Sequence, residues 1–115
     1  MSRDTLFMLD PDCFISEGKS RYCPDCALIA GYLSFYPAVI QELTLRVVAP
    51  PRPRQEIVAL LGEENQSAPV LVLDRDAQVP SGIAFGEING QRFINDPKAI
   101  LAYLGQKHTA GGMPL

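Results

Sequence analysis

Two cysteines at the head of a helical pattern limit what this chain can fold into more than any other feature. Cys23 and Cys26 enclose Pro24 and Asp25, and apolar residues then recur at helical spacing. A short apolar run over residues 5–9 precedes the pair and is typical of a buried strand. A strand, a loop and a helix that starts at a cysteine pair indicate an α/β domain.

Further strand and helix patterns follow along the chain. Pro37 ends or kinks the first helix, because a proline cannot donate to the helical ladder. Asn89-Gly90 is a strong hairpin signal, and Asp96-Pro97 supplies a cap and a first residue for a last helix. The predicted strands cover 5–9, 43–48, 70–73, 83–88 and 91–94, the predicted helices begin at Pro24, Arg52 and Pro97, and 10–22 and 74–82 are predicted as loops.

The order of these elements predicts one mixed sheet. Strands linked by helices in the first half are expected to run parallel, through right-handed crossovers, and the hairpin adds antiparallel strands. We therefore expect an α/β fold with a mixed sheet of four strands or slightly more and helices on both faces. At 115 residues the chain is expected to form one domain over 1–108, followed by a loose, flexible tail over 109–115.

The net charge and the positions of the cysteines limit which partners the protein can bind and in which cellular compartment it is expected. The net charge of −3 argues against a nucleic-acid surface, which needs clustered Lys and Arg. The apolar run at residues 6–9 is too short for a membrane span or a signal peptide. All three cysteines lie in the first quarter of the chain, which does not suit the disulfide framework of a secreted protein. We therefore expect a cytoplasmic protein with neither a membrane nor a nucleic acid as partner.

The cysteine pair has a specific chemical use at the start of a helix. The first thiol lies near unpaired N–H groups and the positive end of the helix dipole, which favours its thiolate. The second thiol lies one turn further on, where it can attack a mixed disulfide and release the substrate. We therefore predict Cys23 as the nucleophile and Cys26 as the resolving thiol of a thiol–disulfide oxidoreductase. The carboxylate of Asp25 opposes the thiolate, and the nearby Arg21 can offset that charge.

Two other interpretations of the cysteines stay open. The sulfurs of Cys13, Cys23 and Cys26, together with the sole histidine, His108, would make a zinc site. Alternatively, the cysteines are vestigial and the scaffold serves as a non-catalytic binding or interaction module, because a fold does not dictate its function.

Several motifs give the chain a resemblance to a known superfamily. They are Cys23-Pro24-Asp25-Cys26, the run Ser67-Ala68-Pro69-Val70-Leu71-Val72-Leu73, and the stretch from Asn89-Gly90 to Leu104. Over about residues 5–107 the chain resembles the thioredoxin-like superfamily, most closely the glutaredoxins and the N-terminal domain of glutathione S-transferases. It also resembles an uncharacterised bacterial family of such domains, through Pro-Arg-Pro-Arg-Gln at 51–55 and Gly-Glu-Glu-Asn-Gln at 62–66.

This resemblance implies a substrate site around the cysteine pair. Pro69 is expected to be cis and to face the cysteines as part of the catalytic site, and the backbone of Ala68 to pair with a bound peptide or with glutathione. Asn95 and Asp96, at the start of the last helix, are expected to hold a glutathione carboxylate, with a plain helix cap as the alternative for Asp96. Tyr22, directly before the pair, is assigned to the same binding site. The expected partner is a protein disulfide or glutathione disulfide, and no cofactor is expected.

Two further features bear on regulation and assembly. The loop over residues 10–22 is longer than a minimal protein of this class needs, and it carries Cys13, which is expected to form a regulatory disulfide with Cys23 or to be a free thiol. No residue between Asp25 and Glu42 is charged. The first helix is therefore expected to be covered on both sides, either by the last helix and the long loop or by the partner subunit of a homodimer.

Overall fold

A computed structural model of the protein describes residues 3–114. The strands are β1 (Asp4–Leu9), β2 (Ile15–Ser16), β3 (Lys19–Ser20), β4 (Leu43–Val48), β5 (Val70–Val72), β6 (Gly86–Ile88) and β7 (Gln91–Ile94). The helices are α1 (Pro24–Phe35), α2 (Pro37–Ile40), α3 (Gln55–Leu61) and α4 (Pro97–Lys107), with a 3-10 turn, η1, at Pro11–Cys13. Five strands form one mixed sheet in the order β4-β1-β5-β7-β6, which lies within the expected range of sizes.

Strand directions agree with the expectation in part. β1 and β4 are parallel, as predicted for strands joined through a helix. β5, however, runs antiparallel to β1, so the expected parallel pairing is wrong for the strand that follows α3. The reason lies in the register, because Val48 at the end of β4 pairs with Leu9, and Val70 at the start of β5 pairs with the nearby Phe7. The chain thus leaves β4 and enters β5 at the same end of the sheet, so that β5 runs in the opposite direction to β4 and β1.

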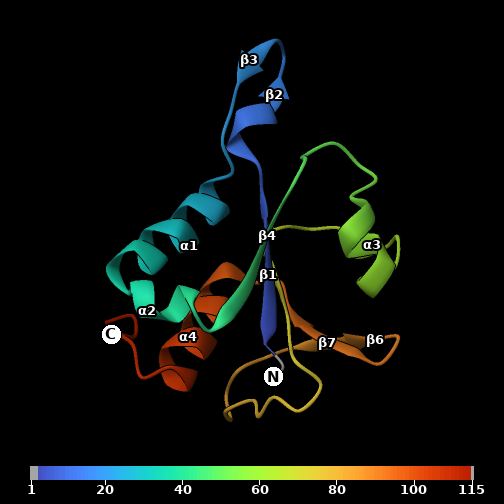
Figure 1. The fold of residues 1–115 in the computed structure, drawn as a ribbon. Helices are drawn as coiled ribbons and strands as arrows, with labels where there is room; N and C mark the ends of the chain where they lie inside the picture. Colours follow the sequence, from blue (N-terminus) through green and yellow to red (C-terminus); the bar gives the residue numbers. More distant parts are fainter. Residues whose placement is uncertain (1–2, 115) are drawn as a thin grey trace.

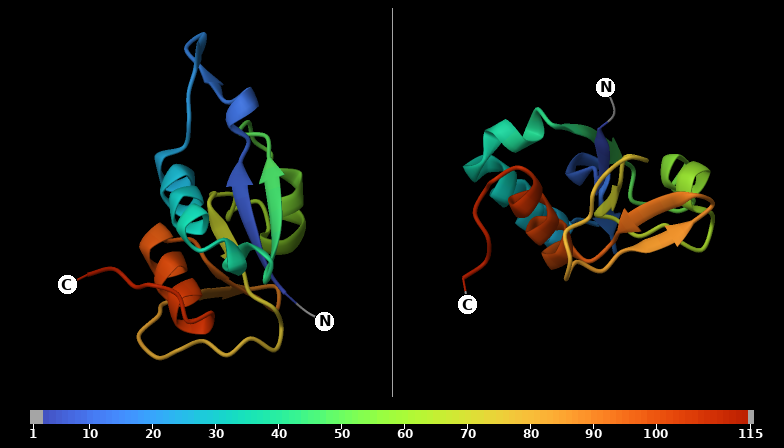
Figure 2. Two further views of the ribbon diagram at one scale, coloured as in Figure 1. Left: turned by 60° about the vertical axis from the view of Figure 1, so that its left-hand side comes forward. Right: turned by 90° about the horizontal axis from the view of Figure 1, so that it is seen from below.

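Helices cover both faces of the sheet, as Figures 1 and 2 show, with α1, α2 and α4 on one side and α3 on the other. Successive side chains of a strand point to opposite faces, and β1 serves both cores in this way. Leu6 packs with α1 and α4, whereas Phe7 packs with Ile57 and Leu61 of α3. Each fully buried side chain of this size contributes about 1.5–3 kcal/mol. β1 is therefore packed on both faces, and the segment that carries the cysteines follows directly after its last residue, Leu9.

The helix boundaries follow the predicted signals. Pro24 is the first residue of α1 and Pro37 separates α1 from α2, as expected for a residue that cannot donate to the helical ladder. Asp96 caps α4, because its carboxylate accepts a hydrogen bond from the backbone N–H of Ala99 at 2.9 Å. α3 begins at Gln55, three residues later than predicted.

The segment over residues 10–22 is not an irregular loop, which corrects the prediction. After η1 it forms a two-stranded hairpin, β2-β3, whose turn residues Glu17 and Gly18 have φ of 55° and 73°. Positive φ at both positions is the requirement of a tight two-residue hairpin turn. Figure 1 shows the hairpin projecting from the domain beyond the start of α1.

Because the hairpin projects outward, the long loop does not cover α1, and that expectation is wrong. α4 packs against one side of α1. The outer side of α1 keeps Leu28 and Phe35 exposed, and Phe35 has 81% of its surface accessible. This uncharged outer face is available to a partner.

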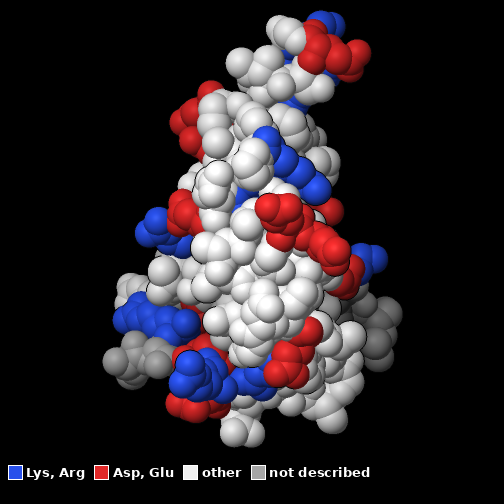
Figure 3. Space-filling model, turned by 90° about the vertical axis from the view of Figure 1, so that its right-hand side faces the viewer, with Lys and Arg blue, Asp and Glu red and all other residues white. Residues whose placement is uncertain are grey.

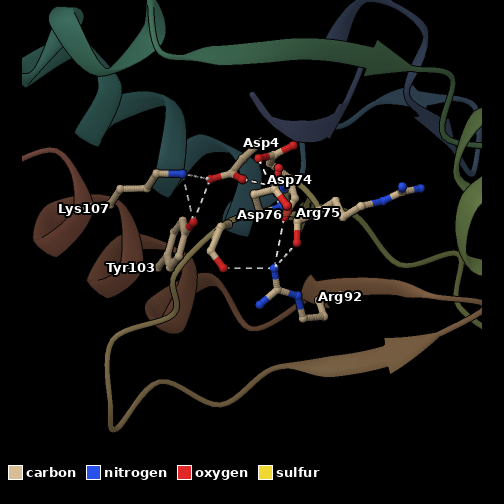
Figure 4. A network of polar contacts seen from close by, with 8 residues as sticks. Asp4, Asp74, Arg75, Asp76, Arg92, Tyr103 and Lys107 are labelled. Carbon is tan, nitrogen blue, oxygen red and sulfur yellow. Dashed lines mark hydrogen bonds and ion pairs between the residues drawn. The ribbon is translucent and has the colours of Figure 1, made fainter. Parts of the chain in front are cut away.

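The predicted hairpin at Asn89-Gly90 is confirmed, and both turn residues have positive φ. Its first strand, β6, is shorter than predicted and begins only at Gly86. The chain before it is held in a loop by Arg92, whose guanidinium donates to the carbonyl oxygens of Asp74, Arg75 and Ala77 at 3.1, 3.0 and 2.9 Å. These contacts tie the beginning of the loop that precedes Gly86 to β7 (Figure 4).

A second polar network joins the first strand to the last helix, also seen in Figure 4. Asp4 is 1% exposed, and its carboxylate accepts hydrogen bonds from the Asp74 backbone N–H at 2.6 Å, the Tyr103 hydroxyl at 2.8 Å and the Lys107 ammonium at 2.9 Å. Burial and the hydrogen bond to Asp4 raise the pKa of Tyr103 to about 12. Burial alone would lower the pKa of Lys107, but its hydrogen bonds to Asp4 and Tyr103 raise it. The carboxylate thus fixes α4 and the loop after β5 against the start of β1.

The C-terminal segment folds back as far as the structure describes it. Ala110 N–H donates to the Gly105 carbonyl at 2.8 Å, and the Tyr32 hydroxyl donates to the Gly111 carbonyl at 2.8 Å. The segment therefore passes along the outside of α1 and α4, and only Leu115 of the predicted tail lies outside the described residues.

The surface on the α3 side carries acidic and basic side chains interspersed with one another, as Figure 3 shows. No helix within residues 3–114 is long and apolar enough to cross a membrane.

Candidate functional site

Cys23 is the N-cap residue of α1, where the first backbone N–H groups of a helix have no partner within it. Its Sγ accepts a hydrogen bond from the backbone N–H of Cys26 at 3.2 Å. The residue is partly exposed, and its Sγ also lies 4.0 Å from the carbonyl oxygen of Ala68. The sulfur that the sequence selects as nucleophile is therefore accessible and receives an N–H donor.

Cys26 has a different environment, although only two residues separate it from Cys23. It is 7% exposed, and the backbone N–H of Leu9 donates to its Sγ at 3.5 Å. Burial, followed by the hydrogen bond to Cys23, raises the pKa of Cys26 to about 12, against the opposing effect of the Leu9 N–H. At neutral pH Cys26 is thus a buried, protonated thiol beside an accessible one.

The residues directly before β5, Ala68 and Pro69, lie near the cysteine pair at one end of the sheet. The peptide bond between Ala68 and Pro69 is cis, as the resemblance implied, and Pro69 is buried. The Ala68 carbonyl is the group that approaches Cys23 Sγ. The residue before the cis peptide bond therefore lies next to Cys23, and a catalytic role of Pro69 remains a prediction.

Arg54 is a further member of this site, and sequence reasoning missed it. Its guanidinium donates to the carbonyl oxygens of Pro50 and Gln66 at 2.8 Å each, and its backbone N–H donates to the buried Gln66 side chain at 2.9 Å. Burial and the neighbouring Arg52 lower the pKa of Arg54, and the nearby sulfur groups of Cys23 and Cys26 act in the opposite direction. The cation that accompanies the cysteines is thus Arg54.

Arg21, by contrast, does not take the role expected of it. Its guanidinium lies 3.7 Å from the carboxylate of Glu17 in the β2-β3 hairpin, and both side chains are exposed.

The sequence does contain one signal for Arg54, the Pro-Arg-Pro-Arg run. The flanking prolines restrict the backbone and therefore the positions that the Arg54 side chain can reach.

Tyr22 lies beside the cysteine pair, and its predicted role in binding a substrate remains a prediction. It is 67% exposed and lines a cavity of about 310 Å³ that also contacts Cys23 and Cys26. Asn95 and Asp96 do not line this cavity. Both are exposed, and the Asp96 carboxylate is used to cap α4.

Cys13 is an exposed free thiol in η1, and the Cys23 and Cys26 thiols are also free. Its Sγ lies 3.9 Å from the Asp10 carbonyl, and partial desolvation together with the carboxylates of Asp10 and Asp12 raises the pKa of the Cys13 thiol. This thiol is therefore a weaker nucleophile at neutral pH than an unperturbed one.

The four candidate zinc ligands are not brought together. Within residues 3–114 no three His, Cys, Asp or Glu side chains cluster in a way that could hold a metal ion. His108 follows the last turn of α4, where burial lowers its pKa and its Nε2 has no hydrogen-bond partner in the described part of the chain. The geometry thus disfavours the zinc site considered from the sequence.

Comparison with known proteins gives a family and no closer relative. No curated protein and no solved structure matches the chain. The family model described as "Protein of unknown function (DUF3088)" matches residues 3–112, and the chain therefore belongs to the DUF3088 family.

Proposed function

We propose that this protein is a thiol–disulfide oxidoreductase of thioredoxin-like architecture, in which Cys23 attacks and Cys26 resolves. The observation that carries the proposal is the contrast between the two thiols. Cys23 Sγ is accessible and accepts an N–H at the start of α1, whereas Cys26 is buried and its pKa is raised to about 12. An accessible thiol next to a buried one suits sequential disulfide exchange, in which the first attacks the substrate and the second then attacks the first.

The architecture supports the same proposal. The sheet is mixed with helices on both faces, the cysteine pair begins the first helix, and Pro69 lies in the segment that faces the pair. These are the features that the resemblance to glutaredoxins and glutathione S-transferases implied.

The reaction proceeds by two exchanges. The Cys23 thiolate attacks one sulfur of a substrate disulfide, a Cys23–substrate mixed disulfide forms, and the other substrate sulfur leaves as a thiolate that takes up a proton. The Cys26 thiol then loses its proton and attacks Cys23 Sγ, which forms the Cys23–Cys26 disulfide and releases the second substrate thiol. The substrate disulfide is reduced by two electrons and the cysteine pair is oxidised by two. A low-molecular-weight thiol such as glutathione, consumed as two molecules per cycle, returns the pair to the dithiol.

Nearby charges act on the first step in opposite directions. The Arg54 cation stabilises the negative charge that develops on the sulfur atoms during the exchange, and the Asp25 carboxylate in the first turn of α1 acts against it. Arg54 is held by two backbone carbonyls, so its charge stays in place during the reaction.

The second candidate is a non-catalytic binding module on the same scaffold. The uncharged outer face of α1 favours it, because Phe35 is 81% exposed and Leu28 lies on the same helix. In that case the cysteines would never cycle between dithiol and disulfide.

One experiment separates the candidates. The protein, in a Cys13→Ser background, is equilibrated with glutathione buffers of increasing ratio of disulfide to thiol, and the oxidised fraction is measured by alkylation and mass. We expect a reversible transition with one Cys23–Cys26 disulfide, loss of that transition in Cys23→Ser, and no bound zinc. A pair that does not oxidise in any buffer, or disulfide reduction that persists in Cys23→Ser, contradicts the proposal.

A further inference from the structure

The cavity beside the two sulfurs is built by three parts of the chain. Met8 of β1 and Val47 of β4 lie on the sheet side, and Ala30 lies on the α1 side. Pro11 and Tyr22 contribute from the two ends of the inserted segment over residues 10–22. The insertion therefore leaves and rejoins the fold at the edge of this cavity.

Small side chains on α1 keep the cavity open. Ala27 and Ala30 face it, and neither is long enough to cover Val47, which is 52% exposed. β4 is the edge strand of the sheet, and Leu45, two residues earlier on the same side of the strand, is also 40% exposed. An apolar surface thus continues from the sulfurs to the edge of the sheet.

The chemistry of the lining selects what can enter. No Asp, Glu, Lys or Arg among the described residues lines the cavity. Its volume of about 310 Å³ is at the small end for ligand sites, which suits one apolar side chain rather than a large ligand. Glutathione carries two carboxylates and an ammonium group, and a charge that enters an apolar site without a partner is strongly disfavoured.

We infer that this cavity is the subsite for an apolar side chain next to the reacting cysteine of a polypeptide disulfide. This inference rests on the proposed function, because the apolar side chain reaches the cavity only when Cys23 attacks the neighbouring disulfide of the polypeptide. The protein therefore reacts with polypeptide disulfides flanked by apolar residues faster than with acidic ones or with glutathione disulfide.

The test measures single turnovers, which need no external reductant. Reduced protein in the Cys13→Ser background is mixed with symmetric disulfides of blocked peptides that carry either Leu or Asp on both sides of the cysteine. The released peptide thiol is followed by chromatography, and glutathione disulfide is the third substrate. We expect the Leu peptide to react about tenfold or more faster than the other two, the scale on which an apolar pocket discriminates.

Two variants locate the preference in the cavity. Ala30→Leu fills the cavity and is expected to bring the ratio of the Leu to the Asp rate close to one. Ser34→Leu adds the same side chain on an exposed site of α1 that does not line the cavity, and it is expected to keep the wild-type ratio. Val47→Lys places a cation at the cavity and is expected to shift the preference towards the Asp peptide.

The outcomes separate this inference from the proposed function. Equal rates for all three disulfides in the wild type, or an unchanged ratio in both Ala30→Leu and Val47→Lys with native circular dichroism, overturn the apolar subsite and leave the redox function intact. A folded wild-type protein whose cysteine pair is oxidised by none of the disulfides overturns the proposed function itself.

Discussion

Replacing Asp4 with alanine is expected to cost more stability than any other single change in its network. The carboxylate is 1% exposed and accepts three hydrogen bonds, from Asp74 N–H, the Tyr103 hydroxyl and the Lys107 ammonium. An unsatisfied buried donor costs about 1–3 kcal/mol, and breaking a buried ion pair costs about 3–5 kcal/mol. Because the Lys107 side chain is 33% exposed and water partly replaces its partner, we expect a loss of about 3–4 kcal/mol in the free energy of unfolding.

Tyr103→Phe is the matched control for this prediction. It leaves Asp4 with the Lys107 ammonium and the Asp74 N–H and removes one hydroxyl donor, so we expect a loss of about 1–2 kcal/mol. Urea unfolding of the reduced proteins, followed by circular dichroism, measures both values. A loss below about 1 kcal/mol in Asp4→Ala, or an equal loss in the two variants, would refute the reasoning.

The same network predicts how stability depends on pH. The pKa of Tyr103 rises from 10 to about 12 in the folded protein, and the pKa of Lys107 rises above 10.5. Both groups hold their protons more tightly when folded, so their contribution is complete below pH 10 and is lost as pH rises from 10 towards 12. Tyr103→Phe should flatten the unfolding free energy in that window, and an unchanged slope would contradict the assignment.

Two more predictions concern the site and the assembly. Arg54→Gln should lower the free energy of unfolding by about 1–3 kcal/mol, because the carbonyl oxygens of Pro50 and Gln66 lose their guanidinium donor; a urea midpoint equal to that of the wild type would argue against this anchoring role. If the outer face of α1 forms a homodimer, light scattering should give the mass of a dimer for the wild type and of a monomer for Phe35→Glu, since Phe35 is 81% exposed in the single chain. A wild-type monomer at high concentration would exclude the dimer.

The parts of the fold that the sequence predicts are those with local causes. Pro24 begins α1, Asn89-Gly90 turns the β6-β7 hairpin, and Asp96 caps α4, each through contacts within a few residues. The cysteine pair belongs to the same class, since its position at the helix start follows from the proline inside it.

The remainder depends on contacts that no local pattern carries. All strand residues of the β2-β3 hairpin are exposed, and its turn lies at Glu17-Gly18. The sequence therefore lacks the alternation of apolar and polar residues that predicts a strand. Arg54 joins the site only because carbonyl groups of Pro50 and Gln66 hold it. The direction of β5 likewise follows from its pairing with β1, not from the helix that precedes it.

The hydrogen bond from Leu9 N–H to Cys26 Sγ gives the protein an internal reporter. That amide is part of the last residue of β1 and donates to the sulfur of the buried thiol. The sulfur becomes a weaker hydrogen-bond acceptor once it forms a disulfide. The Cys26 N–H, which donates to Cys23 Sγ, is the complementary probe on the other thiol. Two backbone amide resonances in a nitrogen-15 spectrum would therefore register the oxidation state of the pair in unmodified protein, without a dye, a substrate or a substitution.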